Sequence, residues 1–154
     1  MGLFSKKIQI KAPINGKLID ITEVKDEAFS SKALGDGMAI IPSEGKVYAP
    51  VDGEIITMID TNHAIGLLSG GVEILIHIGM DTVRLGGKYF KAYVKEGDKV
   101  KAGTLLIEFE KEEVEKEYDI TSPIIISNYS ELKSLTKTDP REVNINELIM
   151  TAVK

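Results

Sequence analysis

Two histidines, His63 and His77, are the side chains of this sequence best suited to accepting and releasing a chemical group near pH 7. The chain contains no Cys, no serine in a nucleophile turn and no glycine-rich phosphate loop, so histidine is the remaining candidate nucleophile. His77 lies in the apolar run 72–78, where strand alternation places it on one face with Leu75, opposite a row of isoleucines. A lone histidine in such a strand is more often a buried core residue, but a second histidine, preceded by Thr61 on the same predicted strand face, favours a site.

The two imidazoles could handle a transferable group together. A neutral imidazole offers one ring nitrogen as a nucleophile when an acceptor holds the proton on the other nitrogen. The carbonyl of Gly79 is predicted to accept the Nδ1 proton of His77 and to leave Nε2 free, because glycine permits a close approach. His63 is predicted to donate from Nε2 to a phosphoryl oxygen, with the Thr61 hydroxyl fixing its ring.

The composition is that of one folded domain with many turns. The 154 residues are 43% hydrophobic and 28% charged, and 14 Gly with 5 Pro favour β structure. The net charge of −5 argues against nucleic-acid binding and suits a basic protein partner. The lack of Cys excludes disulfides and zinc-thiolate sites, and no cofactor is expected. The longest apolar stretch, 64–80, contains Glu73 and His77 and is predicted to be core rather than a membrane span.

An internal repeat predicts duplicated β units that position these residues. The string Ala-Pro-Ile-Asn-Gly-Lys-Leu-Ile at 12–19 returns as Ala-Pro-Val-Asp-Gly-Glu-Ile-Ile at 49–56, 37 residues later. Strands are predicted at 8–11, 17–22, 38–41, 46–49, 54–59, 72–78, 104–108, 124–127 and 147–152. Short helical patterns are predicted at 26–34, 111–118 and 130–136. The expected fold is an all-β antiparallel sandwich of the barrel-sandwich type, with a short exposed leader at 1–7 and a single domain at 8–154.

Several motifs together resemble one known family. They are Thr-Asn-His-Ala at 61–64, His-Ile-Gly-Met-Asp-Thr-Val at 77–83, Gly-Asp-Gly-Met-Ala-Ile at 35–40, Ala-Pro-Val-Asp-Gly at 49–53 and Ile-Ile-Ile-Ser-Asn at 124–128. The chain resembles the glucose-specific enzyme IIA component of the bacterial phosphoenolpyruvate-dependent sugar phosphotransferase system over about its whole length. The resemblance implies a β-sandwich phosphotransferase that takes a phosphoryl group from the carrier HPr and passes it to a cysteine of an enzyme IIB domain.

The resemblance also assigns roles to individual residues. It implies phosphorylation of His77, support from His63 and Thr61, and rim contacts of Asp26 and Asp81 with arginines of HPr. It places an apolar ring around the site at Phe29, Leu34, Ile59, Ile65 and Leu75. A cytoplasmic monomer without metal, with regulatory proteins as possible further targets, completes what the resemblance implies.

Three other functions compete with this interpretation. His77, Asp81 and His63 could bind a catalytic zinc ion, although related zinc peptidases also use a His-x-His pair that this chain lacks. The segment 96–109 is similar to the closing segment of lipoyl and biotinyl domains, but no lysine stands in the motif that such carriers expose. A regulatory binding module stays compatible with the family. The mass and zinc content of the protein after incubation with the phosphoryl donor would distinguish these classes. A gain of one phosphoryl group indicates the phosphocarrier, bound zinc indicates the metal enzyme, and neither indicates the other two.

Overall fold

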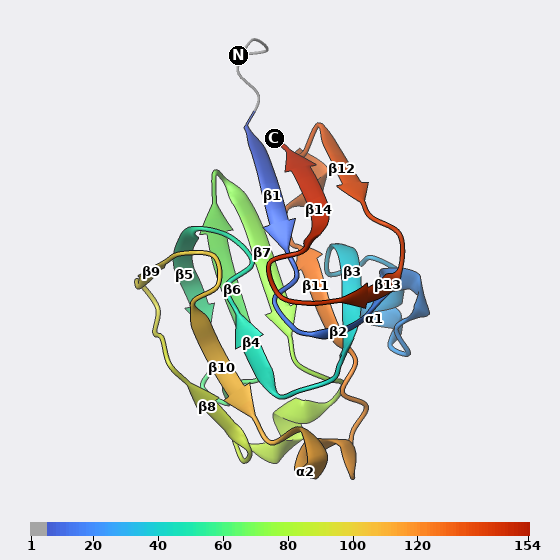
Figure 1. Ribbon diagram of the computed structural model, residues 1–154, viewed down its shortest axis with the longest axis vertical. Coiled ribbons are helices and arrows are strands. Elements are labelled where there is room, and N and C mark those ends of the chain that lie inside the picture. The colour runs from blue at the N-terminus through green and yellow to red at the C-terminus, as the bar shows by residue number, and fades with distance from the viewer. Residues whose placement is uncertain (1–5) are drawn as a thin grey trace.

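The structure is a computed structural model that describes residues 6–154, and within them it confirms the all-β antiparallel fold (Figure 1). The large sheet has the order β13 (Arg141–Val143), β2 (Gly16–Asp20), β3 (Asp36–Pro42), β11 (Ser122–Ile126), β7 (Val72–His77), β6 (Ala64–Ser69), β5 (Gly53–Met58) and β9 (Lys99–Val100). One small sheet has the order β1 (Lys7–Lys11), β14 (Leu148–Val153) and β12 (Ser134–Lys137). The other has the order β4 (Lys46–Tyr48), β10 (Leu105–Phe109) and β8 (Phe90–Ala92).

The helices of the described chain are single turns that connect these strands. They are the 3-10 helices η1 (Ile21–Glu23), η2 (Thr82–Leu85) and η3 (Tyr129–Glu131) and the α-helices α1 (Glu27–Ser30) and α2 (Lys111–Glu115). None of the helices formed by residues 6–154 is long and apolar enough to cross a membrane.

Strand alternation creates the main core. In β7, Val72, Ile74 and Ile76 are buried while Glu73 and His77 are partly exposed, as the sequence pattern predicts. The buried isoleucines join a cluster whose members come from the large sheet and from both small sheets. Each fully buried isoleucine contributes about 1.5–3 kcal/mol relative to an exposed one. The core therefore fixes β7 firmly, and with it the position of His77.

A second apolar cluster lies where η1 and α1 pack on the large sheet. Its strand members include Ile19 of β2, Ala39 of β3 and Ile125 of β11, and Phe29 of α1 joins them. Asp26 caps α1 by accepting a hydrogen bond from the Ala28 amide at 2.9 Å. This cluster holds α1 beside the end of β7.

The predicted repeat is visible as a pair of reciprocal hydrogen bonds. The Lys11 amide donates to the Pro50 carbonyl at 2.9 Å, and the Tyr48 amide donates to the Pro13 carbonyl at 2.8 Å. Each donor stands two residues before the proline of its own repeat, so the two bonds are equivalent under the 37-residue repeat. The duplicated units therefore pack against each other at their turns.

A second pair of repeated contacts extends this duplication. The Asn15 side chain accepts a hydrogen bond from the Ile145 amide at 2.7 Å, and the Asp52 side chain accepts one from the Ala102 amide at 2.8 Å. Correspondingly, β2 pairs with β13 and β5 pairs with β9. Each unit thus contains a second segment, and the two second segments are 43 residues apart in the sequence.

One predicted helix is wrong. Residues 130–136 were expected to be helical, but only Tyr129–Glu131 form a 3-10 turn, and Ser134–Lys137 form β12. β12 pairs with β14 from Ser134–Val153 to Lys137–Met150. The local helical spacing of Leu132 and Leu135 is overridden by the hydrogen bonds that β14 offers along its free edge.

The predicted leader, 1–7, falls largely on residues 1–5, which lie outside the described part of the chain. Lys7 is already the first residue of β1 and pairs with Val153. Lys6 also exchanges backbone hydrogen bonds with Lys154. The first strand therefore begins one residue earlier than the sequence predicts, and the division into a leader and a single domain stays a prediction.

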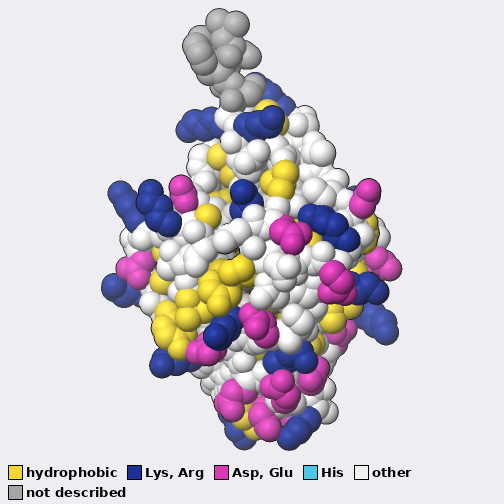
Figure 2. All heavy atoms as spheres, viewed as in Figure 1, with side chains coloured by type: hydrophobic (Ala, Val, Ile, Leu, Met, Phe, Trp, Pro, Cys, Tyr) yellow, Lys and Arg dark blue, Asp and Glu magenta, His cyan; other side chains and the backbone are white. Residues whose placement is uncertain are grey.

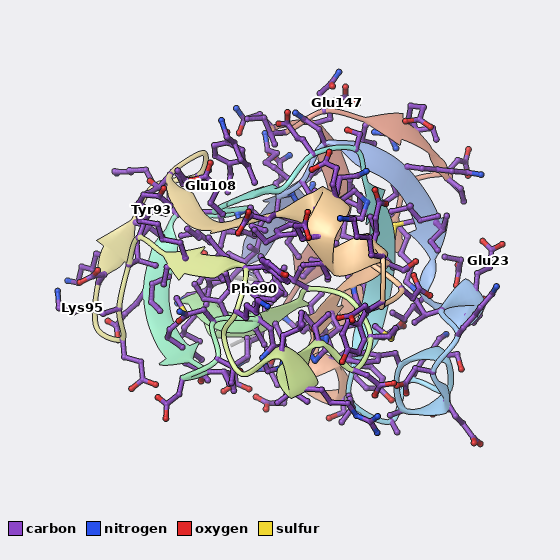
Figure 3. All side chains as sticks on the ribbon, turned by 90° about the horizontal axis from the view of Figure 1, so that it is seen from below. Glu23, Phe90, Tyr93, Lys95, Glu108 and Glu147 are labelled. Carbon is purple, nitrogen blue, oxygen red and sulfur yellow. The ribbon has the colours of Figure 1, made fainter. Side chains whose placement is uncertain are left out.

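The face shown in Figure 2 is not the face that carries the histidines. Hydrophobic side chains gather there over β10 and β4, and no histidine is visible on it. Tyr93 at the margin of this small sheet donates from Oη to Glu108 Oε1 at 2.5 Å, and the two residues lie together in Figure 3. Lys91 stands over the Tyr93 ring at 4.9 Å. The polar groups around this aromatic residue are therefore already paired within the chain.

Candidate functional site

The pairing of β6 with β7 brings the two histidines together. Ala64 is opposite His77 in the ladder, and the Ile78 amide donates to the His63 carbonyl at 2.7 Å. The two imidazole rings lie with their centroids 5.0 Å apart and their planes at 85°. The edge of one ring therefore faces the plane of the other.

A main-chain acceptor holds His77. Its Nδ1 donates to the Gly79 carbonyl at 2.8 Å, which is the hydrogen bond predicted from the sequence. Gly79 has a φ of +73°, a conformation that glycine adopts without strain and that turns its carbonyl back toward the strand. With the proton on Nδ1, the lone pair of Nε2 is available as a nucleophile.

A side-chain hydroxyl holds His63. The Thr61 Oγ1 and the His63 Nδ1 share a hydrogen bond of 2.5 Å. Thr61 was expected on the same strand face as His63, but it lies in the turn between β5 and β6, where Asn62 has a φ of +58°. The turn, rather than strand alternation, points both side chains to the same place. His63 is only 5% exposed, which restricts its ring to this orientation.

Both imidazoles are neutral at pH 7. Burial, followed by the neighbouring His77, lowers the pKa of His63 to about 4. Burial also lowers the pKa of His77, although the Gly79 hydrogen bond and the charges of Asp26 and Asp81 act in the opposite direction. A neutral His77 is the form that can act as a nucleophile.

Two carboxylates and several apolar residues surround His77. Asp26 and Asp81 lie near enough for their charges to act on the imidazole, Asp26 at the start of α1 and Asp81 just before η2. The Phe29 ring lies 5.1 Å from the His77 ring. Leu75 is half-buried and packs on the cluster that contains Phe29. The structure thus brings these four predicted residues together around His77.

Leu34 and Ile59 are exposed, at 47% and 38%, which suits apolar contact residues. They belong to the segments that carry Phe29 and Thr61: the Leu34 amide bonds the Ala28 carbonyl, and the Asn62 amide bonds the Ile59 carbonyl.

Ile65 does not belong to the predicted apolar ring. It is 0% exposed and lies in the main core, opposite Ile76 in the ladder. Strand alternation turns Ile65 inward, because its neighbour Ala64 pairs with His77 on the other face. A partner protein cannot reach it, so this assignment is wrong.

No role is predicted from the sequence for Met80 and Val83, which follow His77 in the chain, or for Ser122, which contacts the turn after His77. Met80 is buried in the same cluster as Phe29, and Val83 of η2 is 53% exposed. Ser122, at the start of β11, accepts a hydrogen bond from the Gly79 amide at 3.2 Å. Met80 and Val83 stand within the motif 77–83 and could have been singled out, whereas Ser122 gives no signal in the sequence.

The geometry of the acidic and imidazole side chains does not form a metal-binding cluster. Across residues 6–154, no group of three or more His, Asp or Glu side chains is arranged to hold a metal ion. The zinc arrangement of His63, His77 and Asp81 considered from the sequence is therefore not assembled in this structure.

Fold and site together define a class: an antiparallel β-sandwich with a pair of neutral imidazoles, one buried and one partly exposed, at the end of a central strand. Comparison with known proteins identifies the family. Residues 8–132 match the family model described as phosphoenolpyruvate-dependent sugar phosphotransferase system, EIIA 1, and the chain belongs to this family.

The relatives include stand-alone and multidomain proteins. The chain is 43% identical over 147 residues to the glucose-specific EIIA component of Halalkalibacterium halodurans, covering 94% of this chain and 85% of the relative. It is 45% identical to a beta-glucoside-specific EIIBCA component of the same organism, but spans only 23% of that protein's length. Glucose permease IIA from Mycoplasma capricolum has a similar structure, with a TM-score of 0.87, 37% identity, and coverage of 95% of this chain and 96% of that one.

Proposed function

We propose that this protein is a phosphocarrier of the sugar phosphotransferase system in which His77 Nε2 accepts a phosphoryl group from phospho-HPr. The observation that carries the proposal is the Nδ1 hydrogen bond of His77 to the Gly79 carbonyl, beside a second neutral imidazole. In the first step the Nε2 lone pair bonds to phosphorus while the phosphorus–nitrogen bond in HPr breaks, and its electron pair returns to the HPr imidazole. His77 keeps its Nδ1 proton throughout.

In the second step a cysteine thiolate of an enzyme IIB domain attacks the phosphorus. The bond to Nε2 breaks, and its electron pair returns to the His77 ring. Because a phosphoryl group on Nε2 leaves the Nδ1 bond to Gly79 in place, His77 would need no proton rearrangement in either step. The group can therefore be passed in both directions without a proton transfer at His77.

His63 supports the transferred group in this proposal. When the Thr61 hydroxyl donates to Nδ1, the neutral ring carries its proton on Nε2, and this N–H can donate to a phosphoryl oxygen. The low pKa of His63, about 4, keeps the ring neutral, so it contributes a hydrogen bond without a full positive charge. A full charge would hold the phosphoryl group more tightly and slow its release.

The partners follow from the family and from the surroundings of His77. Asp26 and Asp81 would meet a basic face of HPr, and Phe29, Leu34, Ile59 and Leu75 would supply apolar contact and exclude water. The enzyme IIB domain would use the same face, since both partners must reach the one nitrogen. A cytoplasmic monomer that serves a glucose-type permease, with regulatory docking to other proteins, remains part of the proposal.

The direct test is incubation of the protein with phosphoenolpyruvate, enzyme I and HPr, followed by intact mass and mapping of the modified residue. We expect a gain of one phosphoryl group, located on His77. The same mixture without HPr is the control and should leave the mass unchanged. A label on another residue, or no gain of mass, would reject the proposal.

A further inference from the structure

The Gly79 carbonyl can orient His77 only if the turn after β7 is itself held rigidly. Two consecutive peptide groups form this turn. The first, between Ile78 and Gly79, is bound on both sides by hydroxyl groups: Thr82 Oγ1 donates to the Ile78 carbonyl at 2.5 Å, and the Gly79 amide donates to Ser122 Oγ at 3.2 Å.

The second peptide group, between Gly79 and Met80, joins His77 to the main chain on the other side. Its carbonyl accepts the proton of His77 Nδ1 at 2.8 Å, and its amide donates to the Asp119 carbonyl at 2.8 Å. The chain of bonds from His77 through this peptide to Asp119 polarises the carbonyl and makes it a better acceptor.

The space around Gly79 is closed as well. A Cβ atom at this position would lie 2.7 Å from Thr82 Cγ2 and 2.9 Å from the Asp119 carbonyl oxygen. A side chain at this position would therefore displace Thr82 or the segment before β11, so the closely packed turn requires glycine here.

Both hydroxyl groups are buried and hydrogen-bonded. Ser122 and Thr82 are each 0% exposed, and Ser122 Oγ also donates to the Ile120 carbonyl at 2.8 Å. The pairing of β7 with β11 extends from Ile74 to Ile76, so the amide of Gly79 lies beyond the ladder. The Ser122 side chain supplies the acceptor that the missing ladder carbonyl would otherwise provide.

We propose that Ser122 and Thr82 are positioning residues for His77: by clamping the Ile78–Gly79 peptide from both sides, their hydroxyls fix the Gly79 carbonyl that selects the Nδ1-protonated tautomer. Neither side chain is placed to touch a phosphoryl group on Nε2, and each acts through the backbone. The consequence for phosphoryl transfer rests on the proposed function of His77, but the consequence for the tautomer does not.

The test uses the variants Ser122→Ala and Thr82→Val, which remove one hydroxyl each with little change in volume. The tautomer and the titration of His77 are followed by ¹⁵N nuclear magnetic resonance of the unphosphorylated protein. We expect a mixture of Nδ1–H and Nε2–H forms in place of a single form. We also expect a lower pKa for His77, because the Gly79 hydrogen bond raises it. Phosphoryl acceptance from HPr should slow by about 10- to 100-fold, because a reaction slows by this much when its nucleophile is displaced from the reactive orientation.

Conservative variants separate positioning from general stability. Ser122→Thr and Thr82→Ser keep the hydroxyls and should restore the single tautomer and most of the rate. Ile124→Val, in the core of the same strand β11, should lower the unfolding temperature but leave the His77 spectrum unchanged. If Ser122→Ala does not fold, Thr82→Val and the volume-conserving Ser122→Cys carry the test.

The outcomes are distinct. An unchanged His77 tautomer and pKa in folded variants that lack either hydroxyl would overturn the positioning role. A shifted tautomer together with an unphosphorylated wild-type His77 would keep the positioning role and reject the proposed function instead. The same spectral change in Ile124→Val would also overturn the proposal, since it would reduce the effect to loss of stability.

Discussion

His77 and His63 lie 5.0 Å apart, yet the chain holds them in different ways. The Nδ1 of His77 is bound to a main-chain carbonyl in a turn that is itself clamped, whereas the Nδ1 of His63 is bound to the hydroxyl of Thr61. A carbonyl oxygen can only accept, so it commits His77 to one tautomer. A hydroxyl can donate or accept, so Thr61 leaves His63 free to present either a proton or a lone pair at Nε2.

This difference suits different tasks at one site. A nucleophile benefits from a single fixed form, because every change of tautomer adds a step to the reaction. A supporting residue must serve the group as it arrives, as it rests on His77 and as it leaves. The type of hydrogen-bond partner at Nδ1, and not only the position of the ring, therefore distinguishes the nucleophile from the supporting residue.

Substitution of the nucleophile His77 should have the largest effect on phosphoryl transfer. In His77→Ala we expect no phosphoryl incorporation from phospho-HPr, while the circular dichroism spectrum stays that of a β protein, since His77 is at the end of β7 and outside the main core. Intact mass after incubation with the full phosphoryl-donor mixture measures this. His63→Ala, run in parallel, should still be labelled; label retained in His77→Ala would remove the distinction between the two residues.

Removal of the supporting imidazole should slow the reaction without abolishing it. In His63→Ala we expect phosphoryl transfer to fall by about 10²-fold, the typical cost of losing one transition-state hydrogen-bond donor. Transfer onward to the enzyme IIB domain should fall more than acceptance from HPr. Rapid-quench kinetics with each partner measure both steps, and native rates in this variant would contradict the supporting role.

The stability of the protein should depend on pH through His63. Its folded pKa of about 4 is below its unfolded value, so between these two pH values the unfolded chain binds a proton that the folded protein does not. The free energy of unfolding should therefore fall by about 2 kcal/mol between pH 7 and pH 5 on account of this residue. His77 acts in the same direction, because its pKa is also lowered by burial.

Urea unfolding at a series of pH values tests this expectation. The matched control is His63→Gln, which should show a shallower slope over the same range, with the remaining slope due to His77. Equal slopes in the two proteins would show that the folded state binds a proton at His63 as readily as the unfolded chain does.

A smaller effect on the rate of phosphoryl transfer is expected from substitution of Thr61, the hydrogen-bond partner of His63. Thr61→Val removes the hydroxyl and keeps the shape, so His63 loses one neutral hydrogen bond worth about 1 kcal/mol, which corresponds to about a fivefold slower transfer. Thr61→Ser keeps the hydroxyl and should retain the native rate. If Thr61→Val and Thr61→Ser transfer equally fast, Thr61 has no part in orienting the ring.

The smallest effect should come from the charges that surround both histidines. Asp81→Asn should reduce the rate of encounter with HPr at low salt and have less effect at high salt, because rim charges act mainly on association. The single-turnover rate at saturating HPr should stay native. Stopped-flow association at two ionic strengths measures the first quantity, and a lost single-turnover rate would place Asp81 in the chemistry instead.

Much of the fold could be predicted because its signals are local. The alternation in β7 and the Asn-Gly and Asp-Gly turns of the repeat follow from the period of a strand and from the backbone freedom of those residues. Short strands such as β8, β9 and β13 were missed, since two or three residues carry no period. The strand β6 was also missed, because its apolar run with Gly66 lacks alternation.

The second segments of the two duplicated units, around Ala102 and Ile145, show why some structural equivalences cannot be detected in the sequence. Asn146 and Gly103 occupy equivalent turns with φ values of +73° and +91°, yet their neighbours share few residue types. The shared property is the backbone conformation, which Asn and Gly both tolerate. Although Thr82 stands within the motif 77–83, the roles of the Ser122 and Thr82 hydroxyls are not visible in the sequence for a similar reason: their partners are backbone groups, which any sequence would present.

The pairing of β1 with β14 determines how the protein could be joined to other domains. Lys6 and Lys154 exchange backbone hydrogen bonds, and Lys154 Nζ also donates to the Gly71 carbonyl at 3.0 Å, just before β7 begins (Figure 1). His77 stands at the other end of the six-residue β7, roughly 20 Å away at the usual rise of a strand. A linker attached at either residue would thus leave the histidine face turned outward, and the length and stiffness of the linker would set the effective concentration of that face near a tethered partner. The same fold can in this way serve in multidomain relatives, where the matching segment is 23% of the polypeptide, and in relatives of about its own length.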